Sequence, residues 1–398
     1  MANKYAVFLS GTDLVHADNK YHGSEVAPPI SVSTTFRQIP GVSLADHDLF
    51  EPTHHSYSRW TQDVSTRVEK VLGKILGGNA MTYRSGLAAT FAALMLLNPR
   101  RVAITGGYMG VQEAVQQFKR IRNGDLEIIG IDDEFRDGDL CWIETPVNPT
   151  GESRNIQYYS DKVHAAGGKL IVDSTFGPPP LQDPFKWGAD VVMHSATKYL
   201  GGHSDLLAGV LVVKTIEEWK QLFDTRTQCG NVMGSFEAWL LLRSLRTLHL
   251  RVPRQSQTGT ALAKWLNLAS GGSSNDGVPA GLVDVVHHSS LQKPDAQGFT
   301  PEKQMEGGYN ATFAIIMTTI DYARALPHAL KYFVPATSLG GVESLIEHRI
   351  ESDPDADPRL VRLSIGVEEL EVRTVMMIYV GLGVLIFTNG MAGFEGRS

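Results

Sequence analysis

The chain has 398 residues, of which 42% are hydrophobic and 20% charged, so it is a globular protein long enough for two domains. Its net charge is −7, and it has no basic run or basic patch interleaved with aromatic residues, which excludes a typical nucleic-acid-binding surface. The first 30 residues lack a secretion signal, and two cysteines are too few for a disulfide scaffold. These features predict a cytoplasmic protein.

The cysteines and histidines give no sign of reactive or metal-binding chemistry. Cys141 lies in an apolar run, which predicts a buried structural thiol rather than a nucleophile. The histidines do not show the spacing of metal ligands, so no metal is expected. The pairs His54-His55 and His287-His288 are predicted to be solvated loop residues.

Residues 1–58 contain several prolines and no periodic pattern, which predicts an arm without a core of its own. From about residue 60 to 250, helix-like and strand-like segments alternate, which predicts parallel βαβ units with helices on both faces. The predicted helices are Ser65–Leu76 and Ser85–Leu97, and the predicted buried strands are Arg101–Thr105, Leu126–Ile131, Cys141–Glu144, Lys169–Val172 and Asp190–Met193.

The remainder predicts a smaller α/β domain after two long helices and a Gly/Ser/Asn-rich loop at 269–281. Its predicted elements are helices at Gly234–Leu250, Arg251–Leu268, Tyr322–Tyr332 and Gly341–His348, and strands at Ala311–Thr318 and Leu360–Ser364. The predicted organisation is therefore an arm at 1–58, a large domain at 59–255 and a smaller domain at 256–398.

Lys198 is the most informative residue. It follows the apolar run Val191–Met193 within His194-Ser-Ala-Thr-Lys-Tyr-Leu-Gly-Gly-His203, and ligands of parallel sheets gather at such strand ends. Asp173 closes another apolar run upstream. A lysine amine and a carboxylate are what pyridoxal 5′-phosphate (PLP) chemistry requires, since the amine forms a Schiff base and the carboxylate keeps the pyridine nitrogen protonated.

Several hydroxyl groups and one helix start suit the phosphate of this cofactor. Ser195 and Thr197 flank Lys198, and Ser85-Gly86-Leu87 opens an alanine-rich helix. A helix N-terminus offers free N–H groups and partial positive charge to a phosphate. Alone, Ser85 would be interpreted as a plain N-cap. Together with the Lys198 segment, the phosphate interpretation is favoured.

From about Val26 to Glu369, ordered motifs resemble the Cys/Met-metabolism family of PLP-dependent enzymes, and in particular its fungal cystathionine γ-synthase-like branch. These motifs are Ala27-Pro-Pro-Ile30, Ser33-Thr-Thr-Phe36, Tyr57-Ser-Arg59, Ser85-Gly86, Glu144-Thr-Pro-Val-Asn-Pro149, Ser338-Leu-Gly-Gly-Val-Glu-Ser344 and Val361-Arg-Leu-Ser-Ile-Gly366. The resemblance implies the α/β fold of PLP-dependent transferases (aspartate aminotransferase-like, fold type I), with a mainly parallel central sheet in the large, PLP-binding domain.

The resemblance also assigns residues to the cofactor. Tyr108 would stack on the ring and act as acid or base near the leaving group, and Asn148 would donate to the phenolate oxygen. Thr175 joins Asp173 on the cofactor side. Tyr57 and Arg59 would reach the phosphate of a neighbouring subunit, which implies at least a dimer with shared sites, and a dimer of dimers is expected. Met109 departs from the family pattern beside Tyr108.

For the substrate, the resemblance implies that Arg362 binds the α-carboxylate, with Ser338, Thr337 and Tyr57 nearby. A charge within a strand such as Leu360–Ser364 is costly unless paired, so a structural ion pair of Arg362 is the alternative. Family members that act on cystathionine through Cγ commonly have a glutamate where this chain has Thr337. Its loss removes a contact to the distal ammonium of cystathionine.

The function implied is γ-replacement on an activated L-homoserine, most simply its O-acetyl ester, through a vinylglycine ketimine. The nucleophile would be sulfide, a thiol or a stabilised carbon nucleophile, as in specialised metabolism. One alternative is a γ-lyase that releases 2-oxobutanoate and ammonia. An alternative of another class is an inactive or membrane-tethered relative.

The tail from residue 372 departs from the family, because Thr374–Phe394 contains no charged residue. Three hypotheses are open: a membrane anchor, a core helix, or translated intron or frame-shifted sequence. Membrane anchoring ranks lowest because glycines and Asn389 weaken the span.

Overall fold

The computed structural model describes residues 9–21, 23–43, 47–275 and 278–369. The tail from residue 372, with its three hypotheses, lies outside the described residues. Within these ranges, no helix is both long and apolar enough to span a bilayer.

The larger sheet contains seven strands and is mainly parallel, as predicted. Only β7 runs antiparallel to its two neighbours, β1 and β6. The spatial order is β1 (Asn79–Tyr83), β7 (Gly209–Val213), β6 (Val191–His194), β5 (Lys169–Asp173), β4 (Leu140–Glu144), β2 (Arg101–Ala103) and β3 (Glu127–Ile129). The sequence prediction missed β1 and β7.

Helices cover both faces of this sheet, so its strands are largely buried, except for the edge strand β3. One core cluster contains alternate strand residues such as Met81, Trp142 and Met193 together with side chains of three helices. These are α3 (Gly86–Leu97), α4 (Met109–Ile121) and α6 (Ile216–Cys229). The other cluster contains the intervening strand residues with α2 (Asp63–Leu76), α5 (Ile156–Ala165) and α7 (Ser235–Leu245). Cys141 is buried in this second cluster, and burial raises its pKa to about 12, so it is the inert thiol that was predicted.

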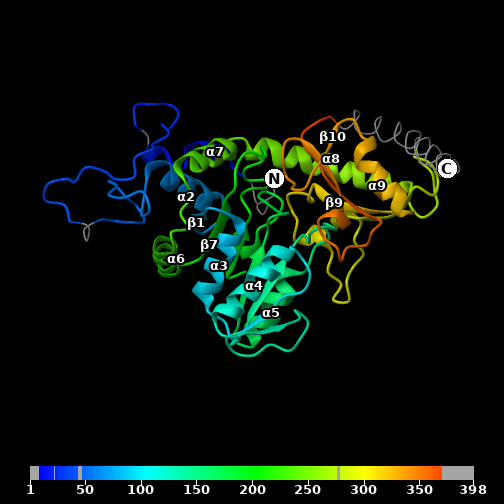
Figure 1. Cartoon of the computed structure of the whole chain (residues 1–398), viewed down its shortest axis with the longest axis horizontal. Coiled ribbons are helices and arrows are strands. Elements are labelled where there is room, and N and C mark those ends of the chain that lie inside the picture. The colour runs from blue at the N-terminus through cyan, green and yellow to red at the C-terminus, as the bar shows by residue number, and fades with distance from the viewer. Residues whose placement is uncertain (1–8, 22, 44–46, 276–277, 370–398) are drawn as a thin grey trace, which may run out of the picture.

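A second, five-stranded sheet follows in the chain. Its order is β10 (Phe333–Pro335), β11 (Ser344–His348), β12 (Leu360–Ser364), β9 (Thr312–Met317) and β8 (Val283–His287), with α9 (Ile320–Ala329) beside it. Figure 1 shows α8 (Leu248–Leu268) extending from beside α7 toward these strands. The predicted boundary at 255–256 falls within α8, and the division into domains stays a prediction. Short 3₁₀ helices occur at Asn19–Tyr21, Pro184–Trp187, Ser289–Leu291, Pro301–Lys303 and Arg349–Glu351.

Two sequence predictions in this second part are wrong. The predicted helix at Gly341–His348 is instead a loop followed by β11, whose five residues are all buried and pair with β12. Tertiary pairing has overridden local preference there. The prediction of a solvated loop at His287-His288 also fails, because His287 ends β8 and the His288 ring is buried, 2.9 Å from the carbonyl oxygen of Asn310.

The N-terminal arm is anchored at its start and then extends away from the body (Figure 1). Leu14 of α1 (Gly11–His16) is fully buried and belongs to the core shared with α2. Asp18 is also fully buried and forms ion pairs with Arg67 and Arg246. The arm thus has no core of its own but shares one.

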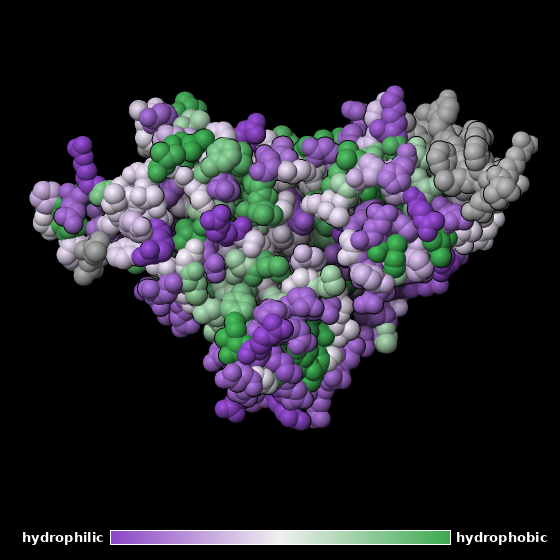
Figure 2. Space-filling view, in the orientation of Figure 1, coloured by the Kyte–Doolittle hydropathy of each residue, from purple (hydrophilic) through white to green (hydrophobic). Residues whose placement is uncertain are grey.

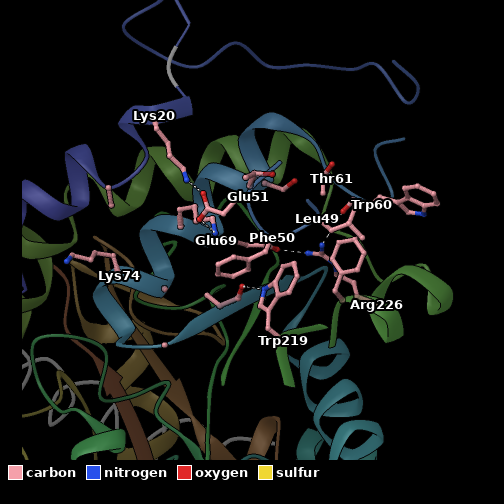
Figure 3. A pocket seen from close by; sticks show the side chains of 18 residues that line it. Lys20, Leu49, Phe50, Glu51, Trp60, Thr61, Glu69, Lys74, Trp219 and Arg226 are labelled. Carbon is pink, nitrogen blue, oxygen red and sulfur yellow. Dashed lines mark hydrogen bonds and ion pairs between the residues drawn. The ribbon is translucent and has the colours of Figure 1, made fainter. Parts of the chain in front are cut away.

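A cavity of about 530 Å³ lies where the arm returns to α2 and α6 (Figure 3). Phe50 packs edge-on against Trp219 with ring centroids 4.9 Å apart, and the Lys70 ammonium lies 3.3 Å from the Phe50 ring centroid. Glu51 and Lys20, which also line the cavity, form an ion pair. None of the predicted site residues lines this cavity.

Candidate active site

A second cavity, of about 450 Å³, gathers almost all of the predicted site residues. It lies at the carboxyl ends of β4, β5 and β6, at the start of α3, and against the strands β11 and β12. The predicted residues that line it are Ser85, Gly86, Leu87, Tyr108, Asn148, Asp173, Thr175, Ser195, Thr197, Lys198, Thr337, Ser338 and Arg362. Tyr57 and Arg59 do not line it.

Lys198 lies in the turn after β6, and its side chain reaches the cavity. Its Nζ donates a hydrogen bond to Oγ of Ser338 at 3.0 Å. Burial and the nearby Arg362 lower the pKa of Lys198 to about 8, although Glu347 opposes the shift. A lowered pKa increases the fraction of neutral amine, which is the form that attacks a carbonyl.

Asp173 ends β5 beside Glu144 at the end of β4, because the two residues are paired in the parallel ladder. Both are buried. Burial raises the pKa of each carboxyl, and in Glu144 the Asp173 carboxylate adds to the effect. A cationic ligand placed here would compensate for the buried negative charge.

The two carboxylates have different tasks in the local geometry. Glu144 accepts hydrogen bonds from the backbone N–H of Tyr108 at 2.8 Å and of Asn148 at 2.6 Å. It therefore holds in place the two loops that carry Tyr108 and Asn148. Within the described chain, the hydrogen bonds to the Asp173 carboxylate come from Thr175 N and Oγ1, at 3.0 and 2.6 Å, and both end on Oδ1. That arrangement leaves Oδ2 for a ligand. Glu144 was part of a quoted motif, but sequence reasoning did not assign it a role.

The start of α3 and the Lys198 turn form a narrow cradle. Ser85 is the N-cap of α3, and its Oγ accepts from Ala88 N at 3.1 Å. A side-chain carbon at Gly86 would come within 3.1 Å of Ser195 Oγ, so glycine keeps the gap open. Free N–H groups at the helix start and a neighbouring hydroxyl suit a phosphate. Thr197 Oγ1 donates to the carbonyl oxygen of Ala208 at 3.2 Å, so its phosphate role stays a prediction.

Tyr108 is the N-cap of α4 and lies at the cavity with 47% of its surface exposed. Gly106 and Gly107 precede it with φ values of 63° and 78°, a conformation that favours glycine. A side-chain carbon at Gly107 would also clash with Glu144 Oε2 at 2.8 Å. The loop therefore presents an exposed aromatic ring, and Met109 beside it lines the same cavity.

Arg362 forms the structural ion pair that the sequence left as one alternative, and its role toward a substrate carboxylate stays a prediction. It lines the cavity, and its guanidinium also forms an ion pair with Glu347 of β11. Its Nη1 donates to Asn148 Oδ1 at 3.1 Å and its Nη2 to the carbonyl oxygen of Ser338 at 3.0 Å. A guanidinium has five N–H donors, so two stay available for a substrate carboxylate. Glu347 was missed because its strand was predicted to be a helix.

Tyr57 lies at the end of the arm and Arg59 directly follows it, with the Arg59 guanidinium 5.1 Å from the centre of the Tyr57 ring. Their role toward a neighbouring subunit stays a prediction. Arg349 lines the cavity as a further cation that sequence reasoning missed, again because its segment followed the wrongly predicted helix.

The residues present fit PLP. The α3 cradle suits the phosphate, Asp173 Oδ2 is available to the pyridine nitrogen, and Asn148 retains its amide N–H₂ group because Arg362 contacts only Oδ1. Lys198 lies at the same cavity with a lowered pKa. When bound, PLP supplies an aldehyde for amine condensation and a ring that accepts electrons.

Comparisons with known proteins agree with a site for PLP. The family model for Cys/Met metabolism PLP-dependent enzymes matches residues 11–374. Cystathionine γ-lyase of Dictyostelium discoideum is 32% identical over 92% of this chain and 95% of its own. Cystathionine γ-synthase of Mycobacterium bovis is 34% identical over 86% of this chain and 88% of its own. The crystal structure of metB from Corynebacterium glutamicum superposes with a TM-score of 0.81 at 26% identity, covering 94% of this chain and 98% of that one.

The cavity, the sheet order and these similarities agree with one another. They confirm the family resemblance, the fold class and the cofactor that the sequence predicted. This chain belongs to the Cys/Met metabolism family of PLP-dependent enzymes.

Proposed function

We propose that this enzyme catalyses γ-replacement on an activated L-homoserine, with the O-acetyl ester as the simplest substrate. A nucleophile takes the place of the acyloxy group at Cγ, forming a C–S or C–C bond and releasing a carboxylate. Relatives named both γ-synthase and γ-lyase are compatible with chemistry at Cγ.

The chain's own residues suit the proton transfers that this reaction needs. Lys198 Nζ, with a pKa of about 8, is suited to take a proton from Cα of the substrate and move one at Cβ. Arg362 has two N–H donors left to hold the α-carboxylate. Tyr108 lies on the exposed side, where its hydroxyl would assist the departing group.

The observation that carries the proposal is that the cavity has no negative charge at Thr337. This neutral residue lines the cavity where cystathionine-binding relatives commonly have glutamate. The carboxylate that does lie at this end, Glu347, is already paired with Arg362. Thr337 offers no charge to the distal ammonium of cystathionine and Glu347 is already paired, so a partner without that ammonium is favoured.

The test offers O-acetyl-L-homoserine with sulfide, cysteine or acetoacetate in competition and identifies the products by mass spectrometry. We expect a γ-substituted product from sulfide or acetoacetate in preference to cystathionine. Predominant formation of cystathionine would overturn the argument from Thr337. A Lys198→Ala variant should lose both turnover and borohydride trapping of PLP, whereas the exposed Lys220→Ala should keep both.

A γ-lyase is the second candidate, because the D. discoideum relative carries that name. The two reactions diverge after the γ-substituent leaves, because elimination, unlike replacement, yields 2-oxobutanoate and ammonia. Incubating O-acetyl-L-homoserine without a nucleophile separates them: rapid keto-acid release supports the lyase. The inactive or membrane-tethered alternative predicts neither product and no visible absorbance from lysine-bound PLP.

We also propose that the enzyme acts as an oligomer with shared sites, in keeping with the predicted dimer of dimers. The arm extends from the body and exposes Val26 and Val32 to 95% and 87% (Figure 1). Figure 2 shows hydrophobic patches where the arm joins the body near α2 and α7. Exposed apolar side chains of this kind favour burial against another protein surface. A cytoplasmic location stays a prediction.

A further inference from the structure

We propose that Arg349 is a specificity-determining residue that binds a carboxylate on the γ side of the reaction, carried either by the leaving acyl group or by the incoming nucleophile. The inference rests on the proposed γ-replacement and deepens it by naming the charge of the second substrate or of the leaving group.

Arg349 begins the 3₁₀ helix that directly follows β11, and it lines the Lys198 cavity. Its side chain is 9% exposed, so the cation is taken almost entirely out of bulk water. Its Nη1 lies 3.1 Å from Ser352 Oγ. Its Nε is buried and has no hydrogen-bond partner among the described residues. An arginine that is both buried and incompletely bonded at a cavity wall is suited to a ligand with oxygen acceptors.

The acidic partners of Arg349 do not compensate it fully. Glu347 lies 3.5 Å from its Nη1, at the limit of a hydrogen bond, while the other oxygen of Glu347 pairs with Arg362. Asp353, with 25% of its side chain exposed, lies 3.4 Å from Nη2. Two buried guanidiniums thus share one buried carboxylate. Because a buried charge is costly without close pairing, a ligand carboxylate at this place would be stabilised.

The surroundings select the sign of the ligand charge. Lys198 and Arg362 add positive charge to the same cavity wall, and Thr337 adds none of the negative charge that an ammonium would need. The two carboxylates Glu144 and Asp173 belong to the other, cofactor side, at the ends of β4 and β5. At the end of the cavity near Thr337, the two guanidiniums of Arg349 and Arg362 face the one carboxylate of Glu347, so the net charge there is positive. The planar fork of Arg349 matches a carboxylate.

Two sources of the carboxylate are separated by two pairs of substrates. The first compares O-succinyl- with O-acetyl-L-homoserine, both with sulfide, so that only the leaving group differs in charge. The second compares 3-mercaptopropionate with propanethiol, both with O-acetyl-L-homoserine. In Arg349→Gln we expect KM to rise about tenfold or more for the charged member of one pair, with kcat and the neutral member little changed. The affected pair identifies the source.

Arg349→Lys keeps the charge and should restore part of the lost affinity. Arg324→Gln is the matched control, because Arg324 is an exposed arginine that pairs only at the surface with Asp321. Equal rises of KM for both members of each pair in Arg349→Gln would show a merely structural role and overturn the inference. So would unchanged KM values throughout.

A binding measurement keeps the test independent of turnover. Isothermal titration of the PLP-loaded enzyme with succinate should show weaker binding in Arg349→Gln than in wild type, while succinamide, which has the same carbon chain but no carboxylate, should not distinguish the two proteins. If wild type forms no replacement product at all, the proposed function fails, and the succinate titration alone then decides the role of Arg349: equal succinate affinity in both proteins rejects it.

Discussion

Lys198 and Ser338 are 140 residues apart in sequence, yet the lysine Nζ lies 3.0 Å from the serine Oγ. Ser338 has a φ of 82°, a left-handed conformation that a serine rarely adopts. Its carbonyl oxygen accepts from Arg362 at 3.0 Å, so two cations hold this one residue. Such strain costs about 1–3 kcal/mol and persists only where the surroundings impose it.

Ser338→Gly and Ser338→Ala should separate this strain from the hydrogen bond. Both variants lose the Oγ that accepts from Lys198, so both should lose a similar share of activity. Only glycine relieves the left-handed backbone, so Ser338→Gly should be about 1 kcal/mol more stable than Ser338→Ala. Urea unfolding of the two apo proteins measures the difference. Equal midpoints would mean that the backbone at residue 338 relaxes freely.

The pKa of Lys198 predicts the pH dependence of cofactor attachment. Burial and Arg362 lower this pKa from 10.5 to about 8, and only the neutral amine condenses with an aldehyde. The rate of PLP attachment should therefore rise with pH, with its midpoint near 8, and level off above. Stopped-flow absorbance of apo enzyme mixed with PLP measures this profile.

Arg362→Gln should move that midpoint to higher pH. The substitution removes the repulsion by Arg362 and leaves the negative charge of Glu347 less compensated, and both changes raise the pKa of Lys198. Arg324→Gln, at the exposed surface, should leave the profile in place. A profile centred at the ordinary lysine value of 10.5 in wild type, or unmoved in Arg362→Gln, contradicts this account.

The site was more predictable than the strands that support it. Lys198, Asp173 and Ser85 lie at strand ends or helix starts, where local sequence signals the chemistry, and the cavity brings them together. β7 is a continuous apolar run, Gly209–Val213, which is the pattern of a buried strand. β1 reads Asn-Ala-Met-Thr-Tyr, and only its pairing with β7 makes it a strand.

The electrostatic partners could not be predicted because they depend on register between distant strands. Glu347 meets Arg362 only because β11 and β12 pair with these residues opposite each other. Glu144 meets Asp173 in the same way across β4 and β5. Sequence alone indicates that a buried arginine needs a partner, but it does not indicate which carboxylate provides it.

Asp173→Asn should stabilise the apo protein while it disables the enzyme. Burial raises the pKa of Asp173, so the native state binds more protons than the unfolded state above the ordinary value of 3.8, and stability falls as pH rises through that window. Asparagine removes the charge and keeps an oxygen for both Thr175 donors. We expect a gain on the order of 1–3 kcal/mol at pH 7 that disappears near pH 3.

Turnover of the same variant should fall about 100-fold or more, because no acid then faces the pyridine nitrogen. The control is Asp190→Asn: burial raises the pKa of Asp190, but bonds from His164 and Leu170 outweigh this and lower it, so the variant should be less stable at pH 7. Denaturant unfolding of the apo proteins at several pH values measures both effects. A loss of stability at pH 7 in Asp173→Asn would refute the argument.

Shared active sites predict complementation between defective subunits. Tyr57 and Arg59 lie where the arm joins the large domain, outside the cavity of their own chain, whereas Lys198 lies at that cavity. Arg59→Ala and Lys198→Ala should each have little activity, but a mixed dimer would contain one site with both residues intact. Random pairing on co-expression then restores about a quarter of wild-type activity.

Co-expression of Asp173→Asn with Lys198→Ala is the control: both defects lie in one cavity, so each site of a mixed dimer stays impaired. Equal activity from the two mixtures would show that Arg59 does not act across a subunit boundary.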